Sequence, residues 1–263
     1  SYECGLLPIE TDDDGMVPED LERKLAANPK ARLMYIIPSF QNPTGRTWSL
    51  ERRRKILEIA QRYELPILED NPYGELRYEG QTIPTLKSMD TTGVVTYMGS
   101  FSKVLSPGIR LGWMLASREL IEKYESAKEC ADLQASTLTQ MVVDTYLAHN
   151  DLDENIRSLN ELYRGRRDKM LALLTAEFPE GSRWTHPCGG LFLWATLPEG
   201  IDTDALLPIT VAHKAAYIPG RAFFADGDEC RCLRLNFSNA SEAQMEQGIA
   251  IMGQVFRDAL AKG

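Results

Sequence analysis

Short apolar runs alternate with amphipathic segments along the first half of the chain. The runs predict strands because they are short, rich in branched or aromatic side chains and bounded by turn-forming residues. They are Arg32–Ile37, Leu65–Asp70, Val94–Met98 and Leu111–Ala116. Between the first two runs, Ser49 precedes apolar residues at helical spacing and predicts the cap of a helix. A strand, a helix and a strand in this order predict a right-handed parallel crossover, which brings Asn42 and Asp70 to one edge of the sheet.

Two long amphipathic segments follow these runs. Ser117 predicts the amino-terminal cap of one long helix that runs toward His149. Asp151 with Glu154 three residues later resembles a capping box, and the apolar positions beyond it predict a second long helix. The alternation of strands with helices up to this point is typical of an α/β fold.

The remaining chain has a different pattern of apolar and polar residues. Short strand-like runs and turns precede a last amphipathic helix that begins after Ser241. The runs are Leu191–Trp194, Ala216–Ile218 and Cys232–Phe237. We therefore predict a partial, mostly parallel α/β sheet with flanking helices in residues 1–150. A smaller α+β domain is predicted in residues 151–263.

Composition excludes several classes of protein. The 263 residues are 43% hydrophobic and 25% charged, which is ordinary for a globular chain. We expect a cytoplasmic protein without a membrane partner, because no apolar run reaches the roughly 18 residues of a membrane span and no signal segment opens the chain. The net charge of −9 opposes nucleic-acid binding by this segment. Five cysteines lack disulfide spacing and are expected to be reduced core residues, and no metal site is predicted.

The densest group of reactive side chains lies in Ser100–Arg110, after the predicted strand Val94–Met98. It combines hydroxyls, an amine and a guanidinium. Charged clusters usually lie on a solvated surface, but the carboxyl end of a strand in an α/β sheet is where such folds bind ligands. The stretch therefore predicts an amine nucleophile beside an anion site.

Three other polar features are ambiguous when each is taken alone. A loop such as Asn42–Gly45 is most often a plain turn, and an acid such as Asp70 at a strand end is commonly a cap. Arg234, within an apolar strand, has the pattern of an arginine whose charged end reaches solvent. These features indicate a functional site only when they are combined with the stretch that contains Lys103.

Asp70 and Lys103 follow two different predicted strands, so a flat ring can lie between them. Pyridoxal 5'-phosphate requires a lysine that forms a Schiff base with its aldehyde and an acid that keeps its ring nitrogen protonated. The two residues predict this cofactor, with Lys103 as the covalent lysine. Ser100, Ser102 and Arg110 supply hydroxyl donors and a forked cation suited to a phosphate. The G-x-x-x-x-G-K-[ST] loop of nucleotide-binding proteins is absent from the sequence.

Ordered motifs along most of the chain resemble the signature of the class I and II, fold-type I pyridoxal-phosphate aminotransferases. They are Asn42–Gly45, Asp70–Tyr73, Ser100–Lys103 with Pro107–Trp113, and Cys232–Phe237. The resemblance is closest to the branch that contains 2-aminoadipate, aromatic and branched-chain aminotransferases. It implies a homodimer that moves an amino group from an amino acid to a 2-oxo acid.

The resemblance also implies residue roles. Lys103 forms the Schiff base and then serves as acid and base, and Asp70 holds the pyridinium proton. Asn42 and Tyr73 hydrogen-bond the phenolic oxygen of the cofactor. Arg234 pairs with the substrate α-carboxylate, which Asn42 also borders, while the two serines and the arginine named above hold the phosphate. The expected catalytic residues are Lys103, Asp70 and Tyr73.

Further expectations follow from the same resemblance. Gly189–Gly190 and Tyr217–Phe224 are expected to line the substrate entrance. An amino-terminal part of the large domain, with further contacts to the phosphate and the cofactor ring, is expected to precede Ser1. An alternative function is the aminotransferase-like effector domain of a MocR-type transcription regulator. A β-lyase or a decarboxylating relative is a third possibility.

Overall fold

The computed structural model describes residues 4–225, 227 and 230–261, which divide into two compact units. The large unit contains residues 9–39 and 47–159. The small unit contains residues 4–8, the loop Phe40–Arg46 and the described residues from Asn160 onward. The predicted domain boundary at residue 150 stays a prediction.

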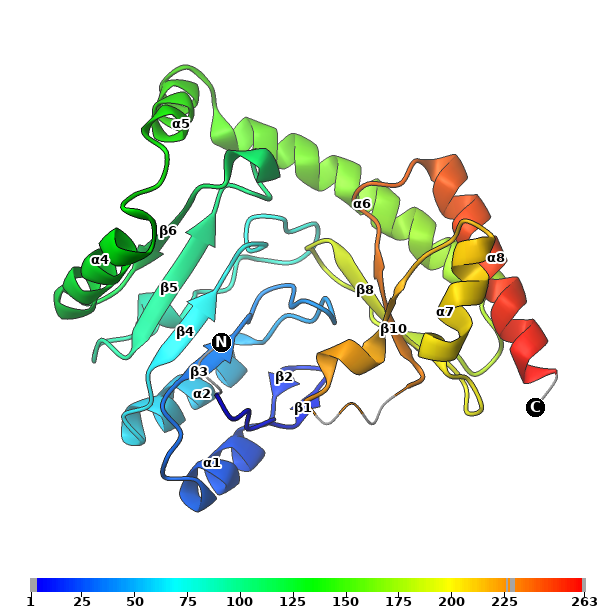
Figure 1. Ribbon diagram of the computed structural model, residues 1–263, viewed down its shortest axis with the longest axis horizontal. Helices are drawn as coiled ribbons and strands as arrows, with labels where there is room; N and C mark the ends of the chain where they lie inside the picture. Colours follow the sequence, from blue (N-terminus) through cyan, green and yellow to red (C-terminus); the bar gives the residue numbers. More distant parts are fainter. Residues whose placement is uncertain (1–3, 226, 228–229, 262–263) are drawn as a thin grey trace. The chain divides into compact units, whose positions relative to one another are not determined.

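The large unit is built on a four-stranded sheet in the order β3-β4-β5-β6 (Figure 1). The strands are β3 (Met34–Ile36), β4 (Ile67–Asp70), β5 (Val95–Ser100) and β6 (Gly112–Leu115). β3, β4 and β5 are parallel, and β6 pairs antiparallel with β5. The helix α2 (Leu50–Arg62) connects β3 to β4, so the predicted strand-helix-strand unit is confirmed. A short hairpin of β1 (Thr11–Asp12) and β2 (Gly15–Met16) precedes the sheet.

One face of this sheet is buried under helices. The core cluster takes its members from β3, β4, β5, α1 (Pro18–Ala27), α2 and α3 (Leu86–Met89). Side chains alternate between the faces of a strand, so Met34 and Ile36 face this core while Tyr35 between them is 55% exposed. The face that carries Tyr35 is therefore the one on which polar groups can serve a ligand.

A buried arginine of α2 fixes the end of β3. Arg53 is fully buried, and its Nη2 donates to the carbonyl of Pro38 (3.1 Å) and to Oγ of Ser39 (2.9 Å). Its Nε donates to the carbonyl of Trp48 (3.2 Å), and its Nη1 to that of Pro84 (3.1 Å). Burial lowers the pKa of Arg53 to about 10, so the guanidinium remains charged at neutral pH. Pro38 and Ser39, which precede the loop Phe40–Arg46, are thus hydrogen-bonded to a charged side chain in the core.

The small unit contains an antiparallel sheet in the order β7-β8-β10-β9. The strands are β7 (Arg183–Trp184), β8 (Phe192–Thr196), β10 (Cys232–Asn236) and β9 (Ile218–Pro219). The other elements are α6 (Leu152–Glu177), which begins in the large unit, α7 (Thr203–Ala212), η2 (Gly220–Phe223) and α8 (Glu242–Leu260). Ser241 and Gln244 form the capping box predicted for the last helix.

The single long helix predicted from Ser117 toward His149 is wrong. The segment forms α4 (Arg118–Asp132) and α5 (Thr137–His149), and Leu133 between them has a positive φ of 64°. The hydroxyl of Ser136 accepts the backbone N–H of Thr139, so it caps a new helix instead of continuing the old one.

The five cysteines are free thiols, but Cys4 and Cys130 are exposed, so the expectation that all five lie in the core is wrong. Among the described residues, no helix combines the length and the apolar character that a membrane crossing requires.

Candidate active site

Asp70 is the last residue of β4, on the sheet face opposite the helical core. Its Oδ2 accepts a hydrogen bond of 2.6 Å from the hydroxyl of Tyr35. Tyr35 pairs with Leu68 in the parallel register, so Tyr35 and Asp70 are diagonal neighbours on one face. Burial first, and then the bond to Asp70, raises the pKa of Tyr35, so its hydroxyl stays a donor at neutral pH. A carboxylate has about four acceptor positions, so Asp70 can also accept from a cationic ring N–H.

The end of β5 places hydroxyl groups on the same face. Asp70 pairs with Met98, and Ser100 lies two residues further along β5 on the side of the sheet that Met98 faces. The Oγ of Ser100 accepts the backbone N–H of Ser102 at 3.0 Å. The two serines predicted to bind phosphate therefore form one short turn at the carboxyl end of a parallel strand.

Lys103 lies half-buried in this turn, directly after β5. The carbonyl of Phe101 accepts the backbone N–H of Leu105 at 2.9 Å, which closes the turn around the lysine. The Nδ2 of Asn155, in the first turns of α6, donates to the carbonyl of Val104 at 2.7 Å. The backbone that carries Lys103 is therefore held on both sides, which favours a defined position of its amine relative to the neighbouring strand.

Tyr73 and Arg110 complete the predicted set of the large unit. Tyr73 is 6% exposed and follows β4. Arg110 is exposed, has a positive φ of 53°, and donates from Nη1 to the carbonyl of Pro107 at 3.2 Å. A non-glycine residue with positive φ is uncommon and occurs often at functional sites. Within the described part of the chain no hydrogen bond joins Arg110 to Ser100 or Ser102, so their shared phosphate role stays a prediction.

Asn42 and Arg234 meet in the small unit. The Nη1 of Arg234 donates to Oδ1 of Asn42 at 2.8 Å. A guanidinium is only a donor, so the amide atom that faces it must be the oxygen. The amide NH2 group of Asn42 is therefore directed to another side, where it can donate to an anionic oxygen. The two residues predicted to bind substrate lie 192 positions apart in the sequence and are joined by this bond.

The loop that carries Asn42 packs tightly against the residues before β8. Phe40, at the start of the loop, is fully buried and has a positive φ of 52°. Gly190 also has a positive φ, of 74°, and a Cβ added to it would lie 2.5 Å from the Cβ of Phe40. This approach requires glycine at position 190 and explains why the loop belongs to the small unit.

Gly190→Ala is expected to destabilise the protein by about 1–3 kcal/mol more than a matched change at Gly200. Gly200 also has a positive φ, of 90°, but an added Cβ there meets nothing within 4 Å. Gly200→Ala therefore carries the backbone strain without the clash against Phe40. Urea denaturation of both variants measures the difference, and equal losses would show that the close packing on Phe40 is unimportant.

The structure thus places the predicted residues in two groups, each within one unit. Asp70 and Ser100 end two neighbouring parallel strands of the large unit, and Ser102 and Lys103 follow the second of them. Asn42 is bonded to Arg234 in the small unit. Sequence reasoning missed Tyr35 and Asn155. In the sequence, Tyr35 resembles an ordinary strand residue and Asn155 resembles a residue on the surface of a helix. The role of Tyr35 depends on the register of β3 against β4, and that of Asn155 depends on where α6 begins.

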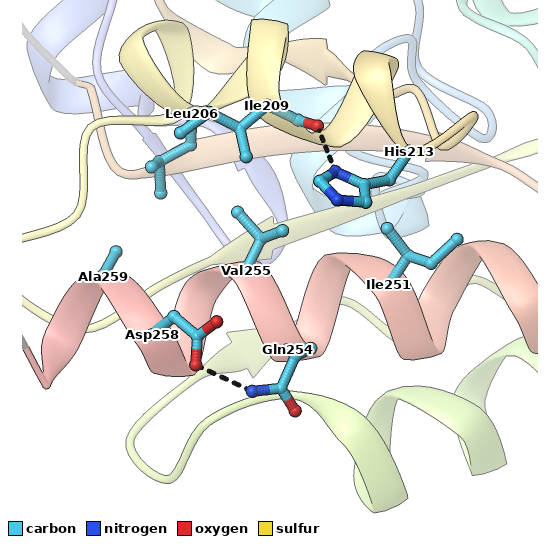
Figure 2. A pocket seen from close by; sticks show the side chains of 8 residues that line it. All are labelled: Leu206, Ile209, His213, Ile251, Gln254, Val255, Asp258 and Ala259. Carbon is cyan, nitrogen blue, oxygen red and sulfur yellow. Dashed lines mark hydrogen bonds between the residues drawn. The ribbon is translucent and has the colours of Figure 1, made fainter.

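Two of the cavities that described residues line lie within the small unit. One, of about 400 Å³, lies between α7 and α8, and Figure 2 shows mainly apolar side chains around it, with the His213 ring bonded to the Ile209 carbonyl at 2.9 Å. None of the predicted site residues, all of which the structure describes, lines it. The other, of about 630 Å³, is bordered by Arg234 and by Tyr217 of the predicted entrance segment.

Residues 4–251 match the model of the family "Aminotransferase class I and II". The chain belongs to this family. Among class I and II aminotransferases, aromatic-amino-acid aminotransferase 1 of Thermococcus litoralis is 43% identical over 265 residues, which are 99% of this chain and 64% of that protein. The crystal structure of Pyrococcus horikoshii kynurenine aminotransferase in complex with PMP, KYN and KYA has a TM-score of 0.93 at 40% identity, covering 97% of this chain and 64% of that one.

The predicted aminotransferase family and fold type are therefore confirmed. The uncharacterized HTH-type transcriptional regulator YisV of Bacillus subtilis is also similar, at 31% identity over 226 residues that are 86% of this chain and 46% of that protein. The chain spans less than two thirds of the length of these aminotransferase relatives.

Proposed function

We propose that the protein is a pyridoxal-phosphate-dependent aminotransferase that exchanges an amino group between an amino acid and a 2-oxo acid. The observation that carries the proposal is that Asp70 ends β4 and that Lys103 lies three residues after the end of the neighbouring parallel strand β5. This position is where open α/β sheets bind ligands. Membership of the aminotransferase family agrees with it.

The donor set fits pyridoxal phosphate. Neighbouring strands are about 4.8 Å apart, so an acid at the end of β4 and an amine after β5 can reach opposite ends of a small aromatic ring. Tyr35 occupies one oxygen of Asp70 and leaves acceptor capacity for a ring N–H. The hydroxyls of Ser100 and Ser102 follow β5 at the same edge, where they suit a phosphate group.

When bound, this cofactor supplies an electron sink that makes the Cα–H bond of an amino acid acidic. Asp70 stabilises the sink by holding the proton on the ring nitrogen. Lys103 would take the proton from the substrate Cα as a general base, and the same amine, once protonated, would serve as the general acid. The hydrogen bonds that hold the turn around Lys103 would favour a defined position of its amine.

The other predicted residues bind and orient. The NH2 group of Asn42, directed by its bond to Arg234, and the hydroxyl of Tyr73 donate to the phenolic oxygen of the cofactor and favour its anionic form. Arg234 binds the substrate α-carboxylate through two parallel hydrogen bonds. Arg110 adds a positive charge to the phosphate site formed by the two serines.

Tyr35→Phe is expected to weaken pyridoxal-phosphate binding and to lower kcat/KM roughly tenfold, because a hydrogen bond to a charged acceptor is lost. Burial raises the pKa of Tyr35. Its neutral hydroxyl, and the stabilisation that this hydroxyl gives through the bond to Asp70, are therefore fully present below the ordinary pKa of tyrosine. They are lost only as the pH rises through the higher pKa of Tyr35 in the folded protein. The loss should therefore be constant between about pH 6 and 9.

The absorption spectrum of the bound cofactor, titrated against pyridoxal-phosphate concentration, measures the affinity without turnover. Tyr63→Phe is the matched control, since Tyr63 lies at the end of α2 and its ring contacts Arg62. If both variants bind the cofactor like the wild type, Tyr35 has no role in holding Asp70.

The proposed function is tested by supplying the whole protein with pyridoxal phosphate, an amino acid and a 2-oxo acid. 2-Aminoadipate, glutamate, leucine and phenylalanine are suitable donors. The expected result is a new 2-oxo acid and a new amino acid in equal amounts. Release of ammonia or carbon dioxide without a requirement for the acceptor would contradict amino transfer and favour a lyase or a decarboxylase.

A second candidate is the effector domain of a transcription regulator, which the similarity to YisV favours. Such a domain would attach pyridoxal phosphate at Lys103 without exchanging amino groups, and the whole protein would contain a helix-turn-helix domain. The gene sequence upstream of Ser1 separates the two candidates. The homodimer and the cytoplasmic location stay predictions.

A further inference from the structure

The guanidinium of Arg234 lies against two aromatic rings of the small unit. Its Cζ is 4.4 Å from the ring centre of Phe192 and 5.2 Å from that of Phe223. Both distances fall within the range of favourable cation–π contacts. We call Phe192 and Phe223 the aromatic clamp. The clamp acts together with Asn42, whose Oδ1 accepts from Nη1 of the same guanidinium at 2.8 Å.

The strand register of the small unit builds this arrangement. Arg234 of β10 pairs with Trp194 of β8, and Phe192 lies two residues from Trp194 on the same face. Phe223, the last residue of η2, packs edge-on against Trp194, with ring centres 5.7 Å apart and planes at 82°. Edge-to-face packing is a preferred geometry for aromatic pairs. Trp194 thus supports the ring that lies beside Arg234.

The clamp restricts a side chain that is otherwise flexible. An arginine carries several rotatable bonds, and binding a carboxylate through two parallel hydrogen bonds requires its plane to be oriented. Contact with Phe192 and Phe223 and the bond to Asn42 fix that plane before a ligand arrives. The rings also remove water from the guanidinium, which strengthens its attraction for a carboxylate. A preoriented group loses less freedom on binding.

We propose that Phe192 and Phe223 are positioning residues that hold Arg234 in the orientation in which it binds the substrate carboxylate. The proposal rests on the proposed function for the identity of the ligand. It gives Phe192, two residues after Gly190, a role in aligning the substrate, and it gives Phe223 of the Tyr217–Phe224 segment the same role beyond lining the entrance.

Phe223→Leu and Phe192→Leu are expected to raise KM for the amino acid and for the 2-oxo acid about five- to tenfold, with kcat changed less than twofold. Phe223→Tyr keeps a ring beside the guanidinium and should restore the wild-type KM. The pyridoxal-phosphate content of the variants should equal that of the wild type. A general loss of structure would instead lower kcat and cofactor content together.

Phe178→Leu is the matched control. Phe178 has the same exposure as Phe192, 8%, and its ring packs against those of Trp184 and Phe256 in the same unit. This variant should lose comparable stability in urea and leave KM unchanged. If Phe192→Leu does not fold, the half-buried Phe223 tests the proposal alone.

A second readout does not depend on the reaction. The rate at which phenylglyoxal modifies Arg234, followed by peptide mass spectrometry, reports how firmly its guanidinium is held. The clamp variants should react several-fold faster than the wild type and than Phe178→Leu. Equal rates of modification, or an unchanged KM with active enzyme, would overturn the proposal. A wild type that fails to transfer amino groups would overturn the proposed function, and the modification rates would still decide whether the clamp holds Arg234.

Discussion

Replacing Lys103 with alanine is expected to lower the rate of amino transfer by at least roughly a thousandfold, because the variant loses the proton-transferring amine of the proposed site. Lys103 is half-buried in a turn and its backbone is held by bonds that do not involve its side chain. The stability of the variant should therefore match that of the wild type. The activity loss would then report chemistry and not unfolding.

The decisive measurement is covalent labelling. Borohydride treatment of the wild type with pyridoxal phosphate should attach the cofactor irreversibly to Lys103, and mass spectrometry of the peptides should find no such attachment in Lys103→Ala. Lys128→Ala is the control, since Lys128 is a surface residue of α4 that pairs with Asp132 at 2.7 Å. Attachment at another lysine, or full activity of Lys103→Ala, would contradict the proposed role.

Arg53→Met is expected to destabilise the protein by about 3–5 kcal/mol, as removal of one member of a buried charged network does. The change leaves the carbonyls of Pro38, Trp48 and Pro84 without their donor. It also leaves the buried carboxylate of Glu69, which favours the charged form of Arg53, without that neighbouring cation. Methionine fills a similar volume, so the loss reflects hydrogen bonds and charge more than a cavity.

Urea denaturation measures the change in the free energy of unfolding. Arg54→Met is the matched control, because Arg54 is the next residue of α2 and is exposed. Its effect should remain within about 0.5 kcal/mol. An equal stability of Arg53→Met and the wild type would show that the buried guanidinium is not needed to hold the end of β3.

The sequence predicted those parts of the fold that depend on neighbours along the chain. Ser49 and Ser241 were recognisable as caps because their hydroxyls accept backbone N–H groups three residues away. The break between α4 and α5 escaped prediction although Ser136 acts in the same way. An amphipathic pattern on both sides of a serine does not reveal whether that serine caps a helix or lies on its surface.

For the candidate site, the sequence predicted which side chains matter but only some of their partners. The strand order of an α/β sheet was enough to place Asp70 and Lys103 after different strands. The partner of Asp70 is Tyr35, 35 residues earlier, and depends on the register of β3 against β4. The partners of Arg234 depend likewise on the register of β8 against β10 and on the packing of η2.

The sequence by itself determined the family, the strand-helix alternation of the large unit and the chemical groups of the proposed site, because these are recorded in short motifs and local periodicity. Only the tertiary structure decided that Tyr35 bonds to Asp70, that Asn42 bonds to Arg234, and that two phenylalanine rings lie against that arginine. The physical reason is that local signals act within a few residues. Contacts between distant residues depend on strand register and side-chain packing, which no single segment contains.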